Sequence, residues 1–245
     1  MKGLCFTVMG EGQGLIVITA DQRASRRHAD AVPGALEALA ALPTATLPGS
    51  LPFERTAGDE IQGVTPSAEA AVDTIGTLLR TGQWQVGIGL GPVEEPLPRS
   101  VRSARGPAFI AARRAVERAH RCPQDLAVDA NVGVDEPAEG GIEQAVLAAE
   151  GALWLWAALL SRRTAEGWEV TDLLERSDSQ KAVARTLGIS PSAVSQRLRT
   201  AGWTEGRRGG ILCADLLAAA AGRAVGSTRT GPVPDDGGDE DEDER

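Results

Sequence analysis

The chain has 245 residues, a formal net charge of −9 at pH 7, 42% hydrophobic residues and only 3% aromatic residues. These proportions are ordinary for a soluble globular protein, and the shortage of aromatic side chains argues against a nucleic-acid surface built on base stacking. Three widely spaced cysteines and two histidines argue against a disulfide framework or a zinc site and favour a reducing, cytoplasmic location.

The negative charge is concentrated at the C-terminus. Residues 235–245 contain eight acidic residues and one arginine, so they carry −7 of the net −9 and leave −2 for the other 234 residues. A segment with so few apolar side chains cannot offset the entropy that is lost on ordering. We therefore expect residues 226–245 to form a disordered acidic tail.

The first half of the chain alternates between strand and helix patterns. Short β-branched apolar runs predict the strands, whereas an apolar face with a terminal proline or glycine predicts the helices. The AGDE segment 57–60 is a hairpin signal, and Ser67 is a good N-cap for the helix that follows. We expect strands at 14–20, 53–56, 61–65 and 84–90, and helices at 29–42, 67–79 and 106–121.

The order β-α-β-β-α-β followed by a helix predicts an α+β fold: a ferredoxin-like or cyclase-palm sheet with helices on one face. From Cys122 to Gly141 the chain is rich in Pro, Gly, Asp and Glu, a composition typical of a domain boundary. We therefore expect a sheet domain at 1–122, a linker at 123–140 and an all-α domain at 141–225.

An apolar helix opens the predicted second domain. The run from Ala145 to Leu160 has only 16 residues and contains Glu150, whereas a bilayer-spanning helix needs about 20 apolar residues, so we expect no membrane segment. Its apolar stripe predicts packing against the protein's own core or, alternatively, against a second copy in a homodimer. The stripe comprises Ile142, Val146, Ala149, Leu153, Trp156 and Leu160.

Residues 179–203 (SQKAVARTLGISPSAVSQRLRTAGW) have the pattern of a helix-turn-helix. A first helix from Ser179 to Leu187 is followed by Gly188, which can adopt the positive φ that the turn requires. Ser190 can cap the second helix, and Pro191 fits its first turn, where no amide donor is needed.

In a helix-turn-helix, the second helix enters the major groove, where polar side chains reach base edges and cations reach phosphates. Residues 179–210 contain six cations and a single acid, Glu205, an excess expected of a phosphate-facing surface. Residues 203–208 (WTEGRR) follow where a wing or flanking loop would lie. The residues predicted to contact double-stranded DNA are Lys181, Ser190, Ser192, Ser195, Gln196, Arg197, Arg199, Arg207 and Arg208.

The segment resembles the helix-turn-helix of winged-helix regulators such as the MarR family and of sigma-factor-like modules. Residues 163–190 (RTAEGWEVTDLLERSDSQKAVARTLGIS) add the preceding helix that such three-helix units require. The resemblance implies binding to double-stranded DNA. The alternative, that the motif serves protein contacts or is only structural, stays open.

Four segments of the first half carry a second resemblance. They are ITADQRASR at 18–26, RTAGDEIQGV at 55–64, VGIGLGPV at 86–93 and RGPAFIAARRAVERA at 105–119. Together they resemble the SatD family and, more distantly, the palm domain of class III nucleotide cyclases and GGDEF proteins. The resemblance covers roughly residues 14–121.

The likeness to the cyclase palm implies a nucleotide site with Mg²⁺. Asp21, at a strand end, and Asp59, in the hairpin turn with Glu60 beside it, match the residues that hold Mg²⁺ against a triphosphate. Gly106, before a helix N-terminus, and Arg113 are the expected nucleotide contacts. In the alternative interpretation, Asp59 and Glu60 only form a polar turn, and Asp21 only ends a strand.

The sequence therefore predicts a DNA-binding transcription regulator whose N-terminal domain senses a ligand, such as a nucleotide or another small effector, or mediates assembly. Ile110 stands near the position where the cyclase helix supplies its asparagine, so we do not expect catalysis. The alternative function is a Mg²⁺-dependent enzyme that binds or converts nucleotides through Asp21 and Asp59, and a third is a structural assembly protein. The acidic tail is hypothesised to compete with DNA for the cationic surface.

Overall fold

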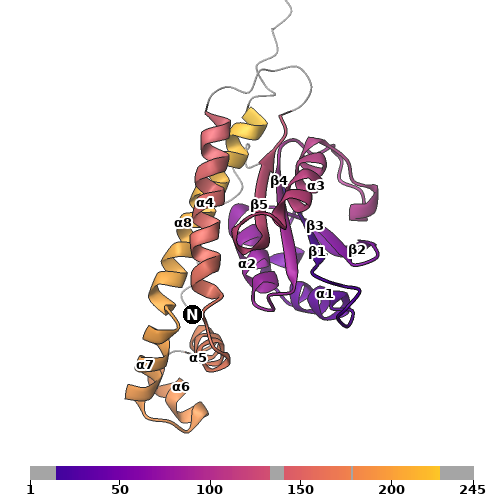
Figure 1. The fold of residues 1–245 in the computed structure, drawn as a ribbon. Helices are drawn as coiled ribbons and strands as arrows, with labels where there is room; N and C mark the ends of the chain where they lie inside the picture. The colour runs from indigo at the N-terminus through magenta and orange to yellow at the C-terminus, as the bar shows by residue number, and fades with distance from the viewer. Residues whose placement is uncertain (1–14, 133–140, 178, 227–245) are drawn as a thin grey trace, which may run out of the picture.

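The computed structural model describes residues 15–132, 141–177 and 179–226, and Figure 1 shows their arrangement. This part of the chain forms a mixed α/β fold with one five-stranded sheet. The predicted acidic tail, apart from Gly226, lies outside the described residues. The strands are β1 (Ile16–Gln22), β2 (Leu51–Ala57), β3 (Glu60–Thr65), β4 (Trp84–Leu90) and β5 (Leu126–Ala130).

The described helices divide between the sheet and a C-terminal extension. Three lie between strands: α1 (Val32–Ala40), α2 (Ala68–Leu79) and α3 (Pro107–Ala119). Five follow the sheet: α4 (Ile142–Leu160), α5 (Ala165–Glu175), α6 (Gln180–Leu187), α7 (Pro191–Thr200) and α8 (Trp203–Gly226). Short 3-10 turns are η1 (Pro43–Thr46), η2 (Val101–Ser103) and η3 (Pro123–Asp125). The predicted strand at 84–90 is confirmed at both ends, and Ser67 caps α2 by accepting a hydrogen bond from the amide of Ala70.

The strand order is β2-β3-β1-β4-β5. The first four strands pair antiparallel, and β5 pairs parallel to β4. In the antiparallel register, Asp21 of β1 lies opposite Glu60 of β3. Because side chains alternate between the two faces of a sheet, directly opposed residues share a face, so these two carboxylates are neighbours.

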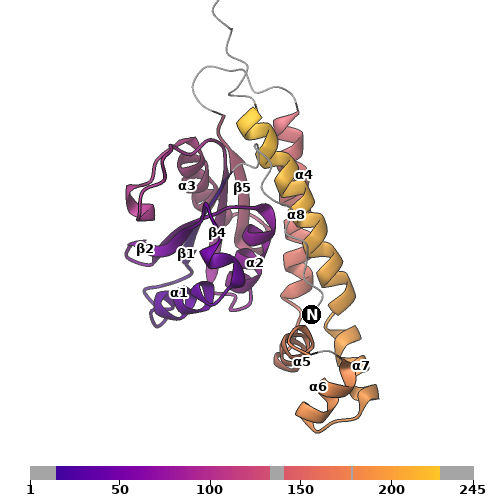
Figure 2. The same cartoon turned by 180° about the vertical axis from the view of Figure 1, so that it is seen from behind.

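One face of the sheet is covered by α1, α2 and the long pair α4 and α8 (Figures 1 and 2). Alternate β1 residues, Ile16 and Ile18, belong to the same buried cluster as Leu153 of α4 and Leu217 of α8. The predicted apolar stripe of α4 therefore packs in the core, and only Val146 of the stripe is partly exposed. The interpretation of that stripe as core packing is confirmed.

The prediction of helices on one face is wrong, because α3 covers the other face and approaches the sheet closely at two glycines of β4. A Cβ atom on Gly87 would lie 2.2 Å from the backbone nitrogen of Val116, and one on Gly89 would lie 2.1 Å from the backbone oxygen of Ala108. No side chain fits at either position without displacing the backbone of α3. These glycines therefore serve helix packing.

The predicted linker at 123–140 is wrong for residues 126–130, which form β5. Leu126, Ala127 and Val128 are buried, but this apolar run is too short to stand out between Asp125 and Asp129. Parallel pairing with β4 and the helices packed around it, both non-local, make this segment a strand.

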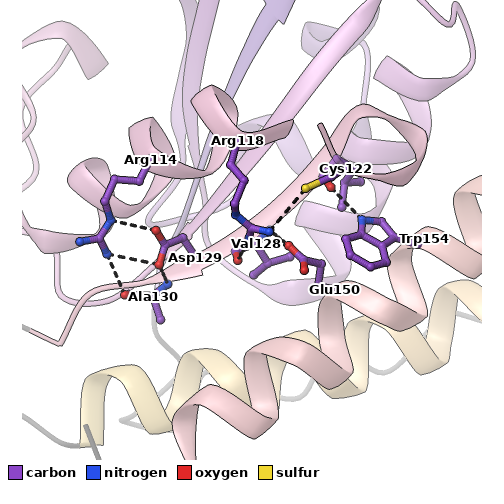
Figure 3. A network of polar contacts seen from close by, with 9 residues as sticks. Arg114, Arg118, Cys122, Val128, Asp129, Ala130, Glu150 and Trp154 are labelled. Carbon is purple, nitrogen blue, oxygen red and sulfur yellow. Dashed lines mark hydrogen bonds and ion pairs between the residues drawn. The ribbon is translucent and has the colours of Figure 1, made fainter. Parts of the chain in front are cut away.

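Side chains close the outer edge of β5 (Figure 3). The Glu150 carboxylate accepts hydrogen bonds from the Val128 amide (2.9 Å) and from the Arg118 guanidinium (2.6 Å), which also donates to the Val128 carbonyl (2.8 Å). Trp154 donates its indole N–H to the Leu126 carbonyl at 2.8 Å. Backbone groups that another strand could have paired with are thus satisfied by α3 and α4.

The other border of the sheet, β2, is irregular. Its register against β3 shifts between Leu51 and Glu54 and again between Arg55 and Ala57. Pro52, between the first two of these residues, has no amide hydrogen to donate. Such interruptions make β2 a poor template for a further strand.

By length and composition alone, α4 could cross a membrane, with a mean hydropathy of 1.2. In this fold, however, it packs against β5 and α8, and its Glu150 and Trp154 bond to β5. These are the contacts of a helix in the core of the fold.

Candidate functional site

Helices α5, α6 and α7 form a compact three-helix unit at one end of the α4–α8 pair (Figures 1 and 2). Its core contains Val170 of α5, Val183 and Ala184 of α6, and Val194 and Leu198 of α7. All five side chains are buried. The preceding helix expected within residues 163–190 is present as α5.

Capping interactions fix the ends of α6 and α7. The hydroxyl of Ser179 accepts from the amide of Ala182, and the hydroxyl of Ser190 accepts from the amide of Ala193. Between the helices, Gly188 has φ 64° and ψ 27°, the left-handed conformation that glycine adopts most easily. The predicted turn at Gly188 and the predicted cap at Ser190 are confirmed, and they fix the start of α7.

The outer surface of the three-helix unit is polar and cationic. Lys181, Ser190, Ser192, Gln196 and Arg199 are exposed, whereas Ser195 and Arg197 are partly buried. Arg197 lies 3.7 Å from the Glu169 carboxylate of α5, which is close to the limit for an ion pair. Within the described residues, Lys181, Arg185 and Arg199 have no ion pair, so their charges are available to a polyanion.

Two hollows lie on this unit. One of about 680 Å³ covers the turn and is lined by Ser179, Lys181, Ala184, Arg185, Gly188, Ile189 and Pro191. The other, of about 300 Å³, lies between the start of α5 and α7, where Thr164 and Glu166 face Gln196 and Arg197. Polar or charged side chains therefore form part of the wall of both hollows.

The predicted wing at 203–208 is wrong. These residues form the first turns of α8, which begins at Trp203. The Arg207 guanidinium lies 5.6 Å from the centre of the Trp203 ring, and the backbone oxygen of Gly206 accepts a hydrogen bond from Trp156. Arg207 and Arg208 are exposed on α8 itself. The sequence could not distinguish a wing from a helix here, because two arginines and a glycine are as compatible with an exposed helix turn as with a loop.

Contacts that the sequence did not predict join the three-helix unit to the sheet. Two guanidinium groups lie over the Trp168 ring of α5, with Arg80 at 4.8 Å and Arg163 at 4.7 Å from its centre. Arg80 also makes a two-pronged ion pair with Asp172 of α5. Arg163 donates to the Ala201 carbonyl after α7 at 2.8 Å, and burial lowers the pKa of its guanidinium.

A second candidate site lies on the α3 side of the sheet. Here the Glu60 carboxylate accepts hydrogen bonds from the Thr56 hydroxyl and from the Arg113 guanidinium. Arg113 also bonds to Glu117 at 2.8 Å, one turn along α3. The structure therefore brings Asp21, Glu60 and Arg113 together, three of the residues that the resemblance to the cyclase palm singles out.

Asp21 has an altered acidity. Burial, reinforced by the negative charges of Glu60 and Asp59, raises its pKa from 3.8 to about 6, although Arg113 acts in the opposite direction. The cluster is thus short of positive charge, and a proton on Asp21 relieves part of the repulsion.

The predicted metal and nucleotide contacts are not assembled as expected. In residues 15–132, 141–177 and 179–226, no group of three His, Cys, Asp or Glu side chains is placed to share a metal ion. Arg113 is already paired with carboxylates. At Gly106, φ is 134° and a Cβ would lie 2.7 Å from the Pro92 oxygen, which also accepts the Ala108 amide. Gly106 therefore allows the loop around Pro92 to pack against the start of α3, and this loop covers the N-terminus of the helix.

Comparison with protein-family models, with curated proteins and with solved structures finds no match to this chain.

Proposed function

We propose that the protein is a DNA-binding transcription regulator in which α6 and α7 form a helix-turn-helix and α7 is the recognition helix. The observation that carries the proposal is the geometry of two capped helices joined at Gly188 and packed on α5. This packing leaves Ser192, Gln196 and Arg199 exposed on α7. Side chains of these types can bond base edges and phosphates in a major groove.

Local charge supports a nucleic-acid partner. Most of the net negative charge of the chain lies in residues 235–245, whereas residues 179–210 carry six cations and one acid. The unpaired cations Lys181 and Arg185 flank the hollow over the turn, where a phosphate backbone could approach. Phosphate neutralisation by such cations supplies much of the affinity of DNA-binding proteins.

We interpret the sheet as a ferredoxin-like unit. Its order β2-β3-β1-β4, with α1 and α2 on one face, agrees with the β-α-β-β-α-β pattern, and we propose its kinship with SatD proteins. In this proposal the unit senses a ligand or mediates assembly in a cytoplasmic homodimer. Dimers are the usual form in which helix-turn-helix regulators read symmetric operators.

The test is selection from a random-sequence DNA pool by the purified full-length protein at two salt concentrations. Arg199→Ala is the test variant, and Arg99→Ala, which removes an exposed arginine from the β4–α3 connection, is the matched control. We expect a motif to be enriched by the wild type and the control, and to be weakened by salt and by Arg199→Ala. Failure to enrich any motif at either salt would refute the proposal.

The alternative, an enzyme that uses Mg²⁺ and a nucleotide at Asp21 and Asp59, receives less support. The pairing of Arg113 with Glu60 leaves few free ligands there. Metal-dependent turnover of a nucleoside triphosphate that is abolished by Asp59→Asn would establish it instead.

A further inference from the structure

A small cavity lies between α1, η1, β2 and α2, away from the three-helix unit. Its volume is about 160 Å³, and apolar side chains such as Leu39, Leu51 and Phe53 form most of its wall. The residues around it carry hydroxyl groups but no charged side chain. An apolar cavity of roughly 150 Å³ is large enough for a benzene-sized molecule.

One buried hydroxyl in this cavity lacks a protein partner. Thr74 of α2 is 3% exposed and lines the cavity, yet its hydroxyl makes no hydrogen bond with another described residue. Among the described residues, every side-chain nitrogen or oxygen that is buried from solvent has a hydrogen-bond partner. The unpaired hydroxyl oxygen of Thr74 must therefore keep some accessible surface, and the cavity is the space that Thr74 lines. By contrast, the hydroxyls of Thr65 and Ser50, also in the wall, donate to the carbonyls of Ile16 and Leu47.

We propose that this cavity is the effector site and that it binds a small neutral molecule, mainly apolar, with one hydroxyl or carbonyl group that bonds to Thr74. The lack of charged wall residues disfavours ions, because a charge buried without a partner is costly. The unpaired Thr74 hydroxyl favours a ligand with one polar atom, because a hydrogen bond to that atom removes the free-energy cost of leaving a buried hydroxyl unsatisfied.

The cavity is connected to the three-helix unit through α2. Thr74 lies in the middle of α2, and Arg80, which caps the C-terminus of that helix, bonds to Asp172 of α5. A helix is stiff over six residues, about 9 Å, so a ligand that shifts α2 also shifts Arg80 against α5. This consequence rests on the proposed DNA-binding function, whereas ligand binding itself does not.

The experiment uses phenol, benzene and benzoate as probes of the full-length protein, with backbone amide NMR shifts as the readout. We expect saturable binding of phenol and benzene, exclusion of benzoate, and shifts centred on residues such as Thr65 and Thr74. Thr74→Val, which keeps the shape, should weaken phenol about tenfold and leave benzene unchanged. Thr77→Val on the same helix, outside the cavity wall, is the matched control.

Ala45→Phe, which fills the cavity from its rim, should abolish binding of both neutral probes. No saturable binding to the wild type, or unchanged binding to Ala45→Phe, would overturn the effector site. DNA affinity measured with and without saturating phenol tests the link through α2, and equal affinities would overturn it. A protein that binds phenol but no DNA refutes the proposed function and leaves the site standing, whereas the reverse result refutes the site alone.

Discussion

Arg80 and Asp172 form a two-pronged ion pair, with nitrogen–oxygen distances of 3.1 and 2.6 Å, that joins the end of α2 to α5. Arg80 also lies over the Trp168 ring. Because the pair is partly exposed, with side-chain accessibilities of 43% and 28%, solvent screens it and limits its contribution to stability. Its importance lies in its position, at the junction of the sheet and the three-helix unit.

Arg80→Ala should lower the free energy of unfolding by about 1 kcal/mol, because both the ion pair and the cation–π contact are lost. Urea denaturation of the full-length protein, followed by tryptophan fluorescence, measures this change. Arg99→Ala is the control and should leave the stability unaltered. A destabilisation no larger than that of the control would show that the junction is held by other contacts.

Two of the exposed α7 side chains, Arg199 and Gln196, should act differently on DNA. Arg199→Ala should weaken binding to all sequences and reduce the slope of affinity against salt by about one, as expected for a lost phosphate contact. Gln196→Ala should instead cost about 1–3 kcal/mol on the preferred sequence only, as expected for a lost base contact. Binding isotherms on the selected motif and on a scrambled duplex separate the two effects. Identical behaviour of the variants would contradict this assignment.

Gly188→Ala should destabilise the three-helix unit by about 1 kcal/mol, because alanine is strained at a φ of 64°. Space is not the reason, since a Cβ at this position would meet no atom within 4 Å. Gly188→Asn should cost less, because asparagine tolerates the left-handed conformation better than alanine does. Thermal unfolding of both variants gives the order. Equal stability of the Ala and Asn variants would mean that backbone strain is not the cause.

Glu150→Ala should lower the free energy of unfolding by about 2 kcal/mol. Glu150 is 3% exposed, and its loss leaves the buried Val128 amide without an acceptor. The released Arg118 is 44% exposed and can be solvated, which limits the cost. Chemical denaturation alongside Glu143→Ala, an exposed acid on the same helix, provides the comparison. Equal stability of the two variants would show that the Glu150 carboxylate does not stabilise the edge of β5.

Asp21 should make stability depend on pH. Its pKa is raised from 3.8 to about 6 in the folded state, so the folded protein binds more protons than the unfolded chain between these values. The stability that protonated Asp21 contributes to the folded state is therefore fully present below pH 3.8 and is lost as the pH rises through 6.

Asp21→Asn cannot ionise and should avoid this loss. Relative to the wild type, it should gain about 1 kcal/mol between pH 4 and pH 7, a value below the full shift because the side chain is only partly buried. Denaturation curves at intervals across this range measure the gain, with Glu94→Gln as an exposed control. A stability difference that does not vary with pH would argue against a raised pKa.

Local signals explain what the sequence could predict. The caps at Ser67 and Ser190, the turn at Gly188 and the strand at 84–90 depend on neighbouring residues, and each is present. The hydrophobic spacing of α4 likewise predicted the buried stripe. In the three-helix unit, the whole candidate surface lies within one short segment, so its residues could be named in advance.

Features that depend on distant contacts could not be predicted. β5 forms a strand because it pairs with β4 and packs against α3 and α4. Its own five residues give little indication of strand structure. The contact between Trp168 and Arg80 joins residues far apart in the sequence. The resemblance to the cyclase palm predicted the Asp21 cluster as a metal site, but Arg113 of α3, which covers this face of the sheet, is paired with Glu60.

The closed edge of β5 and the broken edge of β2 together limit how copies of the protein can associate. Amyloid growth and strand exchange both need an unoccupied row of amides and carbonyls along a flat strand. Here one border is occupied by Glu150, Arg118 and Trp154, and the other is interrupted at Pro52. Neither border of the sheet therefore offers a second copy of the chain a regular strand edge to extend.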